Sequence, residues 1–314
     1  MNKRDLVLNL LDPSKAQGYT PAAFFLHFDP SCHFGHAAVD KHLEFFRTTG
    51  MDFVKIQYEL GFPQLPGIQR PGDWARMPLY GEEFFAPQLE VVEGIVKAVK
   101  REAVVVVTLY SPFMCAAHAV GEENVLQHLS EDPDPVTKGM AIVTESLMTF
   151  VKACVRLGVD GFYHSTQGGE THRLSDRTLF ETFVRPYDLA VMKKAERSCV
   201  FNILHICDYV GEYDDLTGFQ EYPGHVVSCP LKVGGRSLRL AEAYRLFNRP
   251  VMGGLDRRGV LATGSQAQIR AEVEDTLRHA PEGLFLGADC TVPSETPWKN
   301  LRTAIETAHA WQRG

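Results

Sequence analysis

Eight short apolar segments, most of them followed by a stretch with helical spacing, constrain the fold of this chain more than any other feature. The apolar segments are residues 22–28, 53–57, 103–109, 161–164, 200–204, 225–228, 251–254 and 284–287. The spacing of apolar residues predicts helices over residues 2–11, 38–48, 89–99, 136–156, 176–196, 237–246, 265–279 and 298–312. Regular alternation of strand and helix requires a parallel sheet, and eight such units in about 250–300 residues fit a closed (β/α)8 TIM barrel of the α/β class.

The chain shows no shift in composition that would mark a linker, so we expect residues 1–314 to form a single barrel domain. A doubly wound open sheet is the alternative, but the Gly-x-Gly-x-x-Gly pattern of such folds is absent after the first predicted strand. Residues 61–87, rich in proline and glycine, are too long for a plain connection. They are a candidate lid or docking surface, with a packed loop of no special role as the alternative.

Charge and composition argue against two classes of protein. The 314 residues are 45% hydrophobic and 23% charged, with a formal net charge of −7. The pI is near 6.0 and no basic cluster is interleaved with aromatic residues, so we expect no nucleic-acid partner. No apolar run approaches the ~18 residues that span a bilayer, and the first residues lack the pattern of a signal peptide. We therefore expect no membrane partner and a cytoplasmic location.

The seven cysteines are scattered and odd in number, which does not indicate a disulfide framework. Two of them stand out by their neighbours. His205 and Cys207 follow an apolar segment with one residue between them, so their side chains point the same way from an extended backbone. Cys290 follows the last predicted strand, next to Asp289. Imidazole and thiolate ligands together favour Zn²⁺ in a tetrahedral site, and three protein ligands leave one position open.

Other polar residues fall where predicted strands end, and in a barrel this is where active sites are built. Those that we expect around one cavity, as catalytic or substrate-binding side chains, are Asp29, Tyr58, Glu59, Tyr163, His164, Cys229, Asp256 and Asp289. Gln167 and Glu170 belong to a glycine-containing stretch after the fourth strand, which is either a substrate-contacting loop or a plain turn. Glu59, Asp29, Glu170 and Cys229 are also candidates for a fourth metal ligand in the resting protein.

Three stretches resemble the uroporphyrinogen decarboxylase superfamily: residues 253–259 (GGLDRRG), 286–293 (LGADCTVP) and 297–305 (PWKNLRTAI). The resemblance implies an eight-stranded barrel. One branch of this superfamily decarboxylates uroporphyrinogen without a metal and holds the substrate carboxylates with an arginine-rich segment near the N-terminus. Residues 28–36 (FDPSCHFGH) occupy the corresponding region here and contain no arginine.

The other branch comprises zinc-dependent methyltransferases, related to cobalamin-independent methionine synthase. It carries a His-x-Cys after the fifth strand and a Cys after the eighth, which His205, Cys207 and Cys290 match. Many of its members have glycine after the His-x-Cys, whereas this chain has Asp208. The resemblance implies a zinc enzyme that moves a methyl group between a corrinoid protein, carrying methylcobalamin, and a thiol or tetrahydrofolate acceptor. If tetrahydrofolate is the acceptor, Glu59, Asp29 and Glu170 are candidates for the acidic side chain that assists its deprotonation.

Three alternatives remain open from the sequence. The first is a metal-free decarboxylase of the uroporphyrinogen type, which would need clustered arginines in the pocket. The second is a non-catalytic protein that binds a corrinoid or a metal, which would hold zinc without turnover. The third, a zinc hydrolase, is less favoured because two thiolates donate charge to the metal and make its bound water less acidic.

Overall fold

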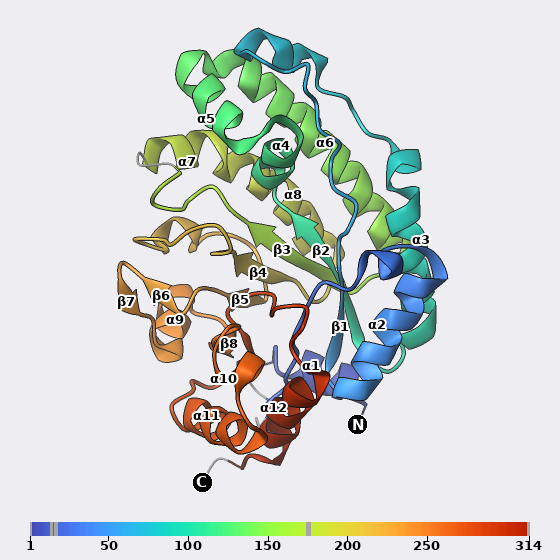
Figure 1. Cartoon of the computed structure of the whole chain (residues 1–314), viewed down its shortest axis with the longest axis vertical. Coiled ribbons are helices and arrows are strands. Elements are labelled where there is room, and N and C mark those ends of the chain that lie inside the picture. Colours follow the sequence, from blue (N-terminus) through green and yellow to red (C-terminus); the bar gives the residue numbers. More distant parts are fainter. Residues whose placement is uncertain (1, 13–14, 16–17, 174–176, 313–314) are drawn as a thin grey trace.

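The computed structural model describes residues 2–12, 15, 18–173 and 177–312, which form a curled parallel sheet surrounded by helices (Figure 1). Within these residues the sheet has seven strands, in the order β1-β2-β3-β4-β5-β8-β9. They are β1 (Phe53–Ile56), β2 (Val104–Tyr110), β3 (Gly161–Thr166), β4 (Ile203–Ile206), β5 (Val226–Ser228), β8 (Val251–Leu255) and β9 (Leu284–Ala288). The predicted α/β fold of the TIM-barrel kind is confirmed.

The first predicted strand, residues 22–28, differs from the expectation. It is reduced to a single bridge between Ala22 and Leu286 of β9. Further along, the carbonyl of Phe25 accepts a hydrogen bond of 2.8 Å from the backbone of Val292, which lies in the segment after β9. The apolar pattern located the segment correctly, but contacts with a loop replace the ladder of a regular strand.

Asp52 holds this segment to the other edge of the sheet, just before β1. Its backbone N–H donates to the carbonyl of Ala22 at 3.0 Å, and its carboxylate accepts from the backbone N–H of Ala22 at 2.7 Å. The same buried carboxylate accepts a hydrogen bond from Tyr19 at 2.5 Å and pairs with His309 at 2.8 Å. Ala22 therefore connects β9 with the start of β1 and closes the curled sheet.

Aromatic side chains fill the interior of the barrel below the site. Phe53, Phe201 and Phe285 are fully buried, and their ring centroids lie 5.6, 5.8 and 6.5 Å apart. Phe25 packs on Phe53 at 5.7 Å and on Tyr163 at 5.5 Å. Because side chains on one face of a strand recur every two residues, this floor places the residues two and four positions later at the carboxyl end of the barrel.

A layer of helices covers the outside of the sheet (Figure 1). Its main members are α2 (Gly35–Thr49), α3 (Glu82–Val99), α6 (Pro133–Leu157), α8 (Arg185–Ser198), α9 (Leu240–Phe247), α11 (Gln266–Arg278) and α12 (Trp298–Ala310). Their ends carry the expected signals. Pro133 starts α6, and Gly158 ends it with a φ of 92°, a left-handed conformation that favours glycine. Ser265 and Gln268 form a capping box at the start of α11.

Three helical regions depart from the sequence prediction. The helix expected over residues 176–196 is two helices, α7 (Arg177–Phe183) and α8, because Pro186 cannot continue an uninterrupted helix and instead opens the second one; residue 176 lies outside the described residues. After β2 the chain forms α4 (Pro112–Val120) and α5 (Glu122–Glu131), which the sequence analysis did not assign. The irregular segment ends earlier than predicted, since α3 begins at Glu82.

The remaining elements are short. They are α1 (Lys3–Asn9), the 3-10 helices η1 (Pro30–Cys32), η2 (Pro71–Arg76) and η3 (Thr217–Phe219), the helix α10 (Val260–Thr263), and a hairpin of β6 (Lys232–Val233) and β7 (Arg236–Ser237). In η2, Trp74 is fully buried, and its indole N–H donates to His128 of α5 at 3.0 Å. This part of the irregular segment is a packed connection.

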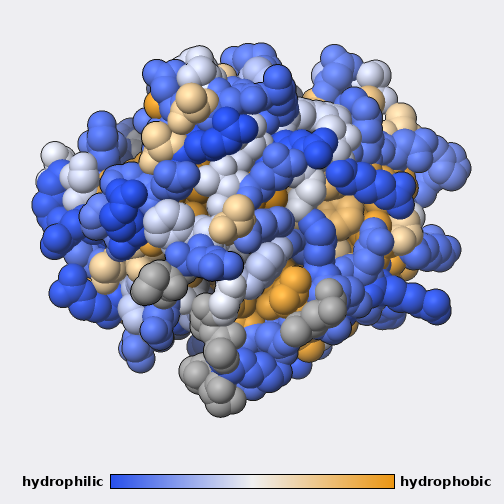
Figure 2. Space-filling view, turned by 90° about the horizontal axis from the view of Figure 1, so that it is seen from below, coloured by the Kyte–Doolittle hydropathy of each residue, from blue (hydrophilic) through white to orange (hydrophobic). Residues whose placement is uncertain are grey.

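The two ends of the chain lie on the same side of the molecule (Figure 1). The face seen from below in that view is mostly hydrophilic, and hydrophobic side chains form only scattered patches on it (Figure 2). Among the helices in the described residues, none combines the length and the apolar character needed to cross a bilayer.

Replacing Asp52 with alanine should destabilise the fold by about 2–4 kcal/mol, because the buried N–H of Ala22 and the imidazole of His309 would lose their acceptor. Urea denaturation followed by circular dichroism measures this. Asp275→Ala, which removes an exposed carboxylate from α11, is the matched control and should leave the midpoint almost unchanged. Equal stability of the two variants would contradict a role of Asp52 in closing the barrel.

Candidate active site

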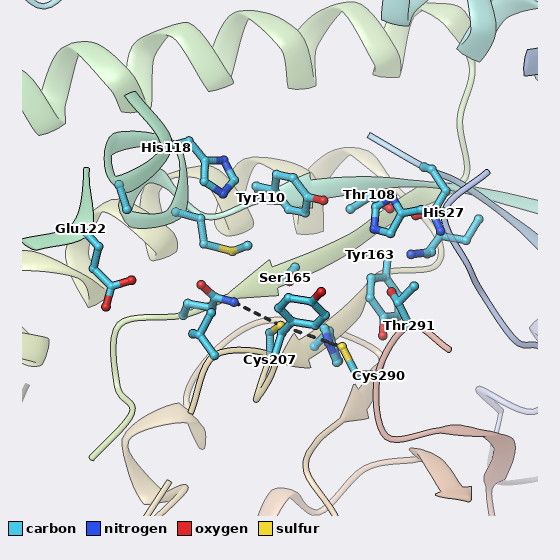
Figure 3. Close-up of a pocket in the computed structure, with 18 of the residues that line it drawn as sticks. His27, Thr108, Tyr110, His118, Glu122, Tyr163, Ser165, Cys207, Cys290 and Thr291 are labelled. Carbon is cyan, nitrogen blue, oxygen red and sulfur yellow. Dashed lines mark hydrogen bonds between the residues drawn. The ribbon is translucent and has the colours of Figure 1, made fainter. Parts of the chain in front are cut away.

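Residues at the carboxyl ends of β1 to β4, together with the segment after β9, line a cavity of about 380 Å³ (Figure 3). Alternate strand residues point into it, as the two-residue period of a strand requires. Thr108 and Tyr110 come from β2, and Tyr163 and Ser165 come from β3. In Figure 3, His118 and Glu122 lie at one end of the cavity and His27 lies at the other.

His205, Cys207 and Cys290 meet at the wall of this cavity. All three are buried, and their potential ligand atoms lie within 4.8 Å of one another. The two sulfur atoms are 4.0 Å apart, and Cys290 Sγ is 3.4 Å from His205 Nε2. Within the described residues no other histidine, cysteine, aspartate or glutamate belongs to this or to a second such group.

These distances fit a zinc ion. In a tetrahedral site, zinc–sulfur bonds of about 2.3 Å and a zinc–nitrogen bond of about 2.0 Å place two sulfurs about 3.8 Å apart and a sulfur and a nitrogen about 3.5 Å apart. The observed separations agree with these values to a few tenths of an ångström. Because each of the three residues also lines the cavity, a fourth position would face the space where a small molecule can enter.

Neighbouring side chains orient the three potential ligands. Ser228 of β5 lies 3.1 Å from His205 Nδ1, which leaves Nε2 directed at Cys290. The side-chain amide of Gln167 donates to Cys207 Sγ at 3.3 Å. A hydrogen bond from Cys290 lowers the pKa of Cys207 well below its usual value, and the same bond raises the pKa of Cys290.

Arg257 links the two cysteine-bearing segments. Its guanidinium contacts Asp208 at 2.8 Å and Asp289 at 2.5 Å, and its backbone N–H donates to Asp289 at 2.8 Å. Asp208 directly follows Cys207, and Asp289 directly precedes Cys290. Burial raises the pKa of both carboxyl groups, and the guanidinium opposes that rise. Asp289, expected from the sequence as a substrate-binding residue, therefore holds a salt bridge beside the potential metal ligands.

A second buried network reaches Cys207 from the side of α5. Arg173 forms a salt bridge with Glu122 of α5, and it donates to Glu170 and Gln167, each at 3.0 Å. Burial raises the pKa of Glu170 to about 7, although the guanidinium of Arg173 opposes the rise. Arg173 thus orients the side-chain amide of Gln167 by donating to its oxygen, and the nitrogen of the same amide donates to Cys207 Sγ. The stretch after β3 is therefore an ordered part of the cavity wall.

Glu59 lies beside the cavity and pairs with two of the histidines near the first predicted strand. His27 Nδ1 is 2.9 Å from one carboxylate oxygen of Glu59, and His33 Nε2 is 4.0 Å from the other. Although burial pushes the pKa of Glu59 upward, the hydrogen bond from His27 and the charges of His27, His33 and Lys55 hold it below its usual value. His27 itself lines the cavity.

Five other residues named from the sequence lie apart from the potential ligands. Asp29 and Asp256 are exposed, and each accepts a hydrogen bond from a nearby backbone N–H. Tyr58 and His164 are buried, and neither the hydroxyl nor the two imidazole nitrogens has a hydrogen-bond partner in the described residues. Burial lowers the pKa of His164 to about 3. Burial also raises the pKa of Cys229 to about 12, and this thiol stands outside the group of three.

The structure adds lining residues that the sequence analysis did not name: Lys55, Gln57, Thr108, Tyr110, Met114, His118, Glu122, Ser165, Arg173 and Thr291. Several were open to inference from strand periodicity, since Thr108 and Tyr110 alternate along β2, and Ser165 follows Tyr163 by two positions. Three further lining residues come from α4 and α5, two helices that were not predicted from the sequence: Met114, His118 and Glu122.

A family model described as uroporphyrinogen decarboxylase (URO-D) matches residues 30–311. The chain belongs to the uroporphyrinogen decarboxylase family. The predicted membership of this family is thereby confirmed. No curated protein matches the sequence.

Solved structures similar to this member of the uroporphyrinogen decarboxylase family share its fold. A methyltransferase from Methanosarcina mazei has a TM-score of 0.81 at 14% identity and covers 98% of each chain. A B12-independent methionine synthase from a Shewanella species, in complex with selenomethionine, has a TM-score of 0.56 at 12% identity over 95% of this chain and 96% of that one. A putative vitamin-B12-independent methionine synthase from Listeria monocytogenes has a TM-score of 0.54 at 14% identity over 95% and 100%. At these identities the likeness shows the fold alone.

The protein purified under anaerobic, reducing conditions with zinc supplied should hold about one zinc ion per chain, and His205→Ala or Cys290→Ser should abolish this binding because two ligands cannot hold the ion tightly. Mass spectrometry of the metal content measures it. Cys229→Ser is the matched control, since this buried thiol lies outside the ligand group, and it should retain the metal. Loss of zinc in Cys229→Ser, or no zinc in the unaltered protein, would contradict the assignment.

Proposed function

We propose that this protein is a zinc-dependent methyltransferase that moves a methyl group between a corrinoid protein, carrying methylcobalamin, and a small thiol or tetrahydrofolate acceptor. One observation carries the proposal: His205, Cys207 and Cys290 converge on a cavity at the carboxyl end of the barrel, with distances that suit zinc. Membership of the uroporphyrinogen decarboxylase family and the fold shared with the Methanosarcina mazei methyltransferase support it.

A bound zinc ion would supply an open coordination position at which an acceptor thiol loses its proton at neutral pH. Side chains of the protein would orient the ligands and accept the proton. Ser228 keeps His205 in the orientation that exposes Nε2, and Gln167 donates to Cys207, which reduces the charge on that sulfur. The pair of Glu59 and His27 is the candidate proton acceptor for a thiol or a pterin nitrogen, because His27 faces the cavity and its Nδ1 lies 2.9 Å from a carboxylate oxygen of Glu59.

The cavity suits a small acceptor that enters from the carboxyl end of the barrel. Tyr209 and Val210 come two and three positions after Cys207, line the cavity, and are 63% and 43% exposed, so they form an apolar rim at which a partner protein can make contact. A corrinoid protein is the partner that a methyl transfer of this kind requires. This rim, rather than the packed irregular segment around Trp74, is the more suitable contact surface.

A metal-free decarboxylase of the uroporphyrinogen type is the second candidate, since the family model carries that description. A substrate with many carboxylates needs many cationic partners. Among the lining residues, Arg173 is the single arginine, and its guanidinium is already bound by Glu122 and Glu170. Lys55 is the other lining residue with a permanent cationic side chain, so the cavity is poorly equipped for a substrate of this charge.

The zinc-loaded protein, mixed with methylcobalamin and a thiol under anaerobic conditions, should demethylate the corrinoid, and the change in its visible spectrum measures the rate. Cys290→Ser should lower kcat/KM by at least about a hundredfold. Without this ligand the protein would lose the zinc ion, whose positive charge stabilises the thiolate of the acceptor. The same preparations are then given tetrahydrofolate as the acceptor and, separately, uroporphyrinogen.

The control for this assay is Cys154→Ser, which alters a buried thiol in α6 far along the chain from the ligands. It should retain full activity. Zinc binding without turnover of any methyl donor would instead favour a non-catalytic binding protein. Release of carbon dioxide from uroporphyrinogen by metal-free protein would establish the decarboxylase.

A further inference from the structure

Cys207 and Cys290 lie in contact with each other at one wall of the cavity (Figure 3). Their sulfur atoms are 4.0 Å apart, although 83 positions separate the two residues in the sequence. Within the described residues, no other pair of cysteines is joined by a hydrogen bond. A disulfide bond is about 2.05 Å long, so each sulfur would have to move by about 1 Å to form one. Rotation of the two side chains about χ1 supplies movements of this size.

The contact between the two sulfur atoms is supported by groups that are not potential metal ligands. The guanidinium of Arg257 binds Asp208 at 2.8 Å and Asp289 at 2.5 Å. These two carboxylates adjoin the two cysteines in the sequence, and neither belongs to the group of three potential ligands. The salt bridges therefore hold the sulfur atoms near each other whether or not an ion lies between them.

The cavity gives small molecules access to both sulfur atoms. The two cysteines line it, but they are only 5% and 7% exposed, so a reagent has to be small to reach them. The side-chain amide of Gln167 donates to Cys207 Sγ at 3.3 Å, an interaction that stabilises negative charge on this sulfur. Electron-rich sulfur is the form of cysteine that attacks peroxides. Cys207 is therefore the nucleophile toward a small peroxide, and Cys290 is the neighbouring thiol that can complete a disulfide.

We propose that Cys207 and Cys290 form a reversible disulfide when a small peroxide enters the metal-free site, and that this bond prevents zinc from binding. Cys207 attacks one oxygen of hydrogen peroxide and the O–O bond breaks, which gives a sulfenic acid and, with the proton of the Cys207 thiol, water. Cys290 then attacks the sulfenic sulfur and the S–O bond breaks. The hydroxide leaves as a second water molecule with the proton of the Cys290 thiol. The two thiols are thereby oxidised by two electrons, and the peroxide is reduced to water.

The disulfide would decide whether the site can be loaded with metal. It would leave His205 as the single ligand of the group, and one imidazole does not hold zinc tightly. In the zinc-loaded protein, both sulfur atoms would be bound to the ion and protected from the peroxide. This inference rests on the metal site of the proposed function, but it does not require the methyl transfer itself.

Protein that has been freed of metal with a chelator and then treated with hydrogen peroxide should contain the cross-link. After free thiols are blocked and the chain is digested with trypsin, mass spectrometry should find residues 198–232 joined to residues 279–299. Dithiothreitol, a dithiol reductant, should separate the two peptides. Protein loaded with zinc before the peroxide is added should form at least about tenfold less of the cross-link in the same time.

The matched controls follow from the digestion, because the first peptide also contains Cys199 and Cys229. Cys199→Ser and Cys229→Ser should retain the cross-link, whereas Cys207→Ser and Cys290→Ser should abolish it. Absence of the joined peptides from the unaltered protein, or their persistence in Cys207→Ser, would overturn the inference.

Zinc content after gel filtration is the second readout. The metal-free protein, treated with peroxide and then offered zinc, should bind at least about tenfold less of it than the untreated protein, and dithiothreitol should restore the binding. Equal zinc binding by the oxidised and the reduced protein would overturn the inference. A reduced protein that binds no zinc would remove the metal site and this inference with it.

Methyl transfer from methylcobalamin, measured on the reduced and zinc-loaded protein, separates this inference from the proposed function. Turnover by a protein that never forms the cross-link leaves the methyltransferase standing and removes the disulfide. A protein that forms the cross-link and thereby loses its zinc binding, but transfers no methyl group when reduced, establishes the disulfide and removes the proposed reaction.

Discussion

Closure of the curled sheet at Ala22 is the constraint on which the rest of the structure depends. Cys290 belongs to the segment after β9, whereas His205 lies in β4 and Cys207 directly follows that strand, and two further strands separate β4 from β9 in the sheet. Only a closed sheet brings these segments to face each other across its interior. Asp52 supports this closure, since its backbone N–H donates to the carbonyl of Ala22 and its carboxylate accepts a hydrogen bond from the N–H of Ala22.

Strand periodicity explains which parts of the fold were predictable from the sequence. Seven of the eight apolar segments became strands of one sheet, because parallel strands buried on both faces consist of continuous apolar residues that are easy to recognise. The remaining segment, residues 22–28, has the same composition but forms a single bridge to β9 and then bonds to the loop after that strand. Composition does not distinguish these two outcomes. The break between α7 and α8 at Pro186 was visible in the sequence, yet the helical spacing continues on both sides of it.

The two-residue period of a strand also explains why alternate strand residues, and not their direct neighbours, belong to the site. Tyr163 faces the cavity, whereas His164, one position later, is buried on the other face of the strand with both imidazole nitrogens unpaired in the described residues. The sequence analysis predicted both as site residues. Lys55 was not predicted from the sequence as a site residue, for a related reason. A lysine within a strand usually lies at a solvent-exposed edge, and only the closed barrel shows that its side chain is enclosed with Phe25 and Tyr163. Contacts between segments distant in the sequence decide both cases.

Asp208 departs from the family pattern, and a salt bridge with Arg257 compensates for its charge. Many members of the metal-binding branch that the sequence resembles have glycine after the His-x-Cys, whereas this chain places a carboxylate beside three potential ligands, two of which are cysteines. The carboxylate would raise the local negative charge. Arg257 compensates, because its guanidinium binds Asp208 and Asp289 together. The compensation has a structural consequence, since one residue now joins the segment that carries Cys207 to the segment that carries Cys290. Arg257 therefore helps to hold the two sulfur atoms, which lie 4.0 Å apart, in their relative positions.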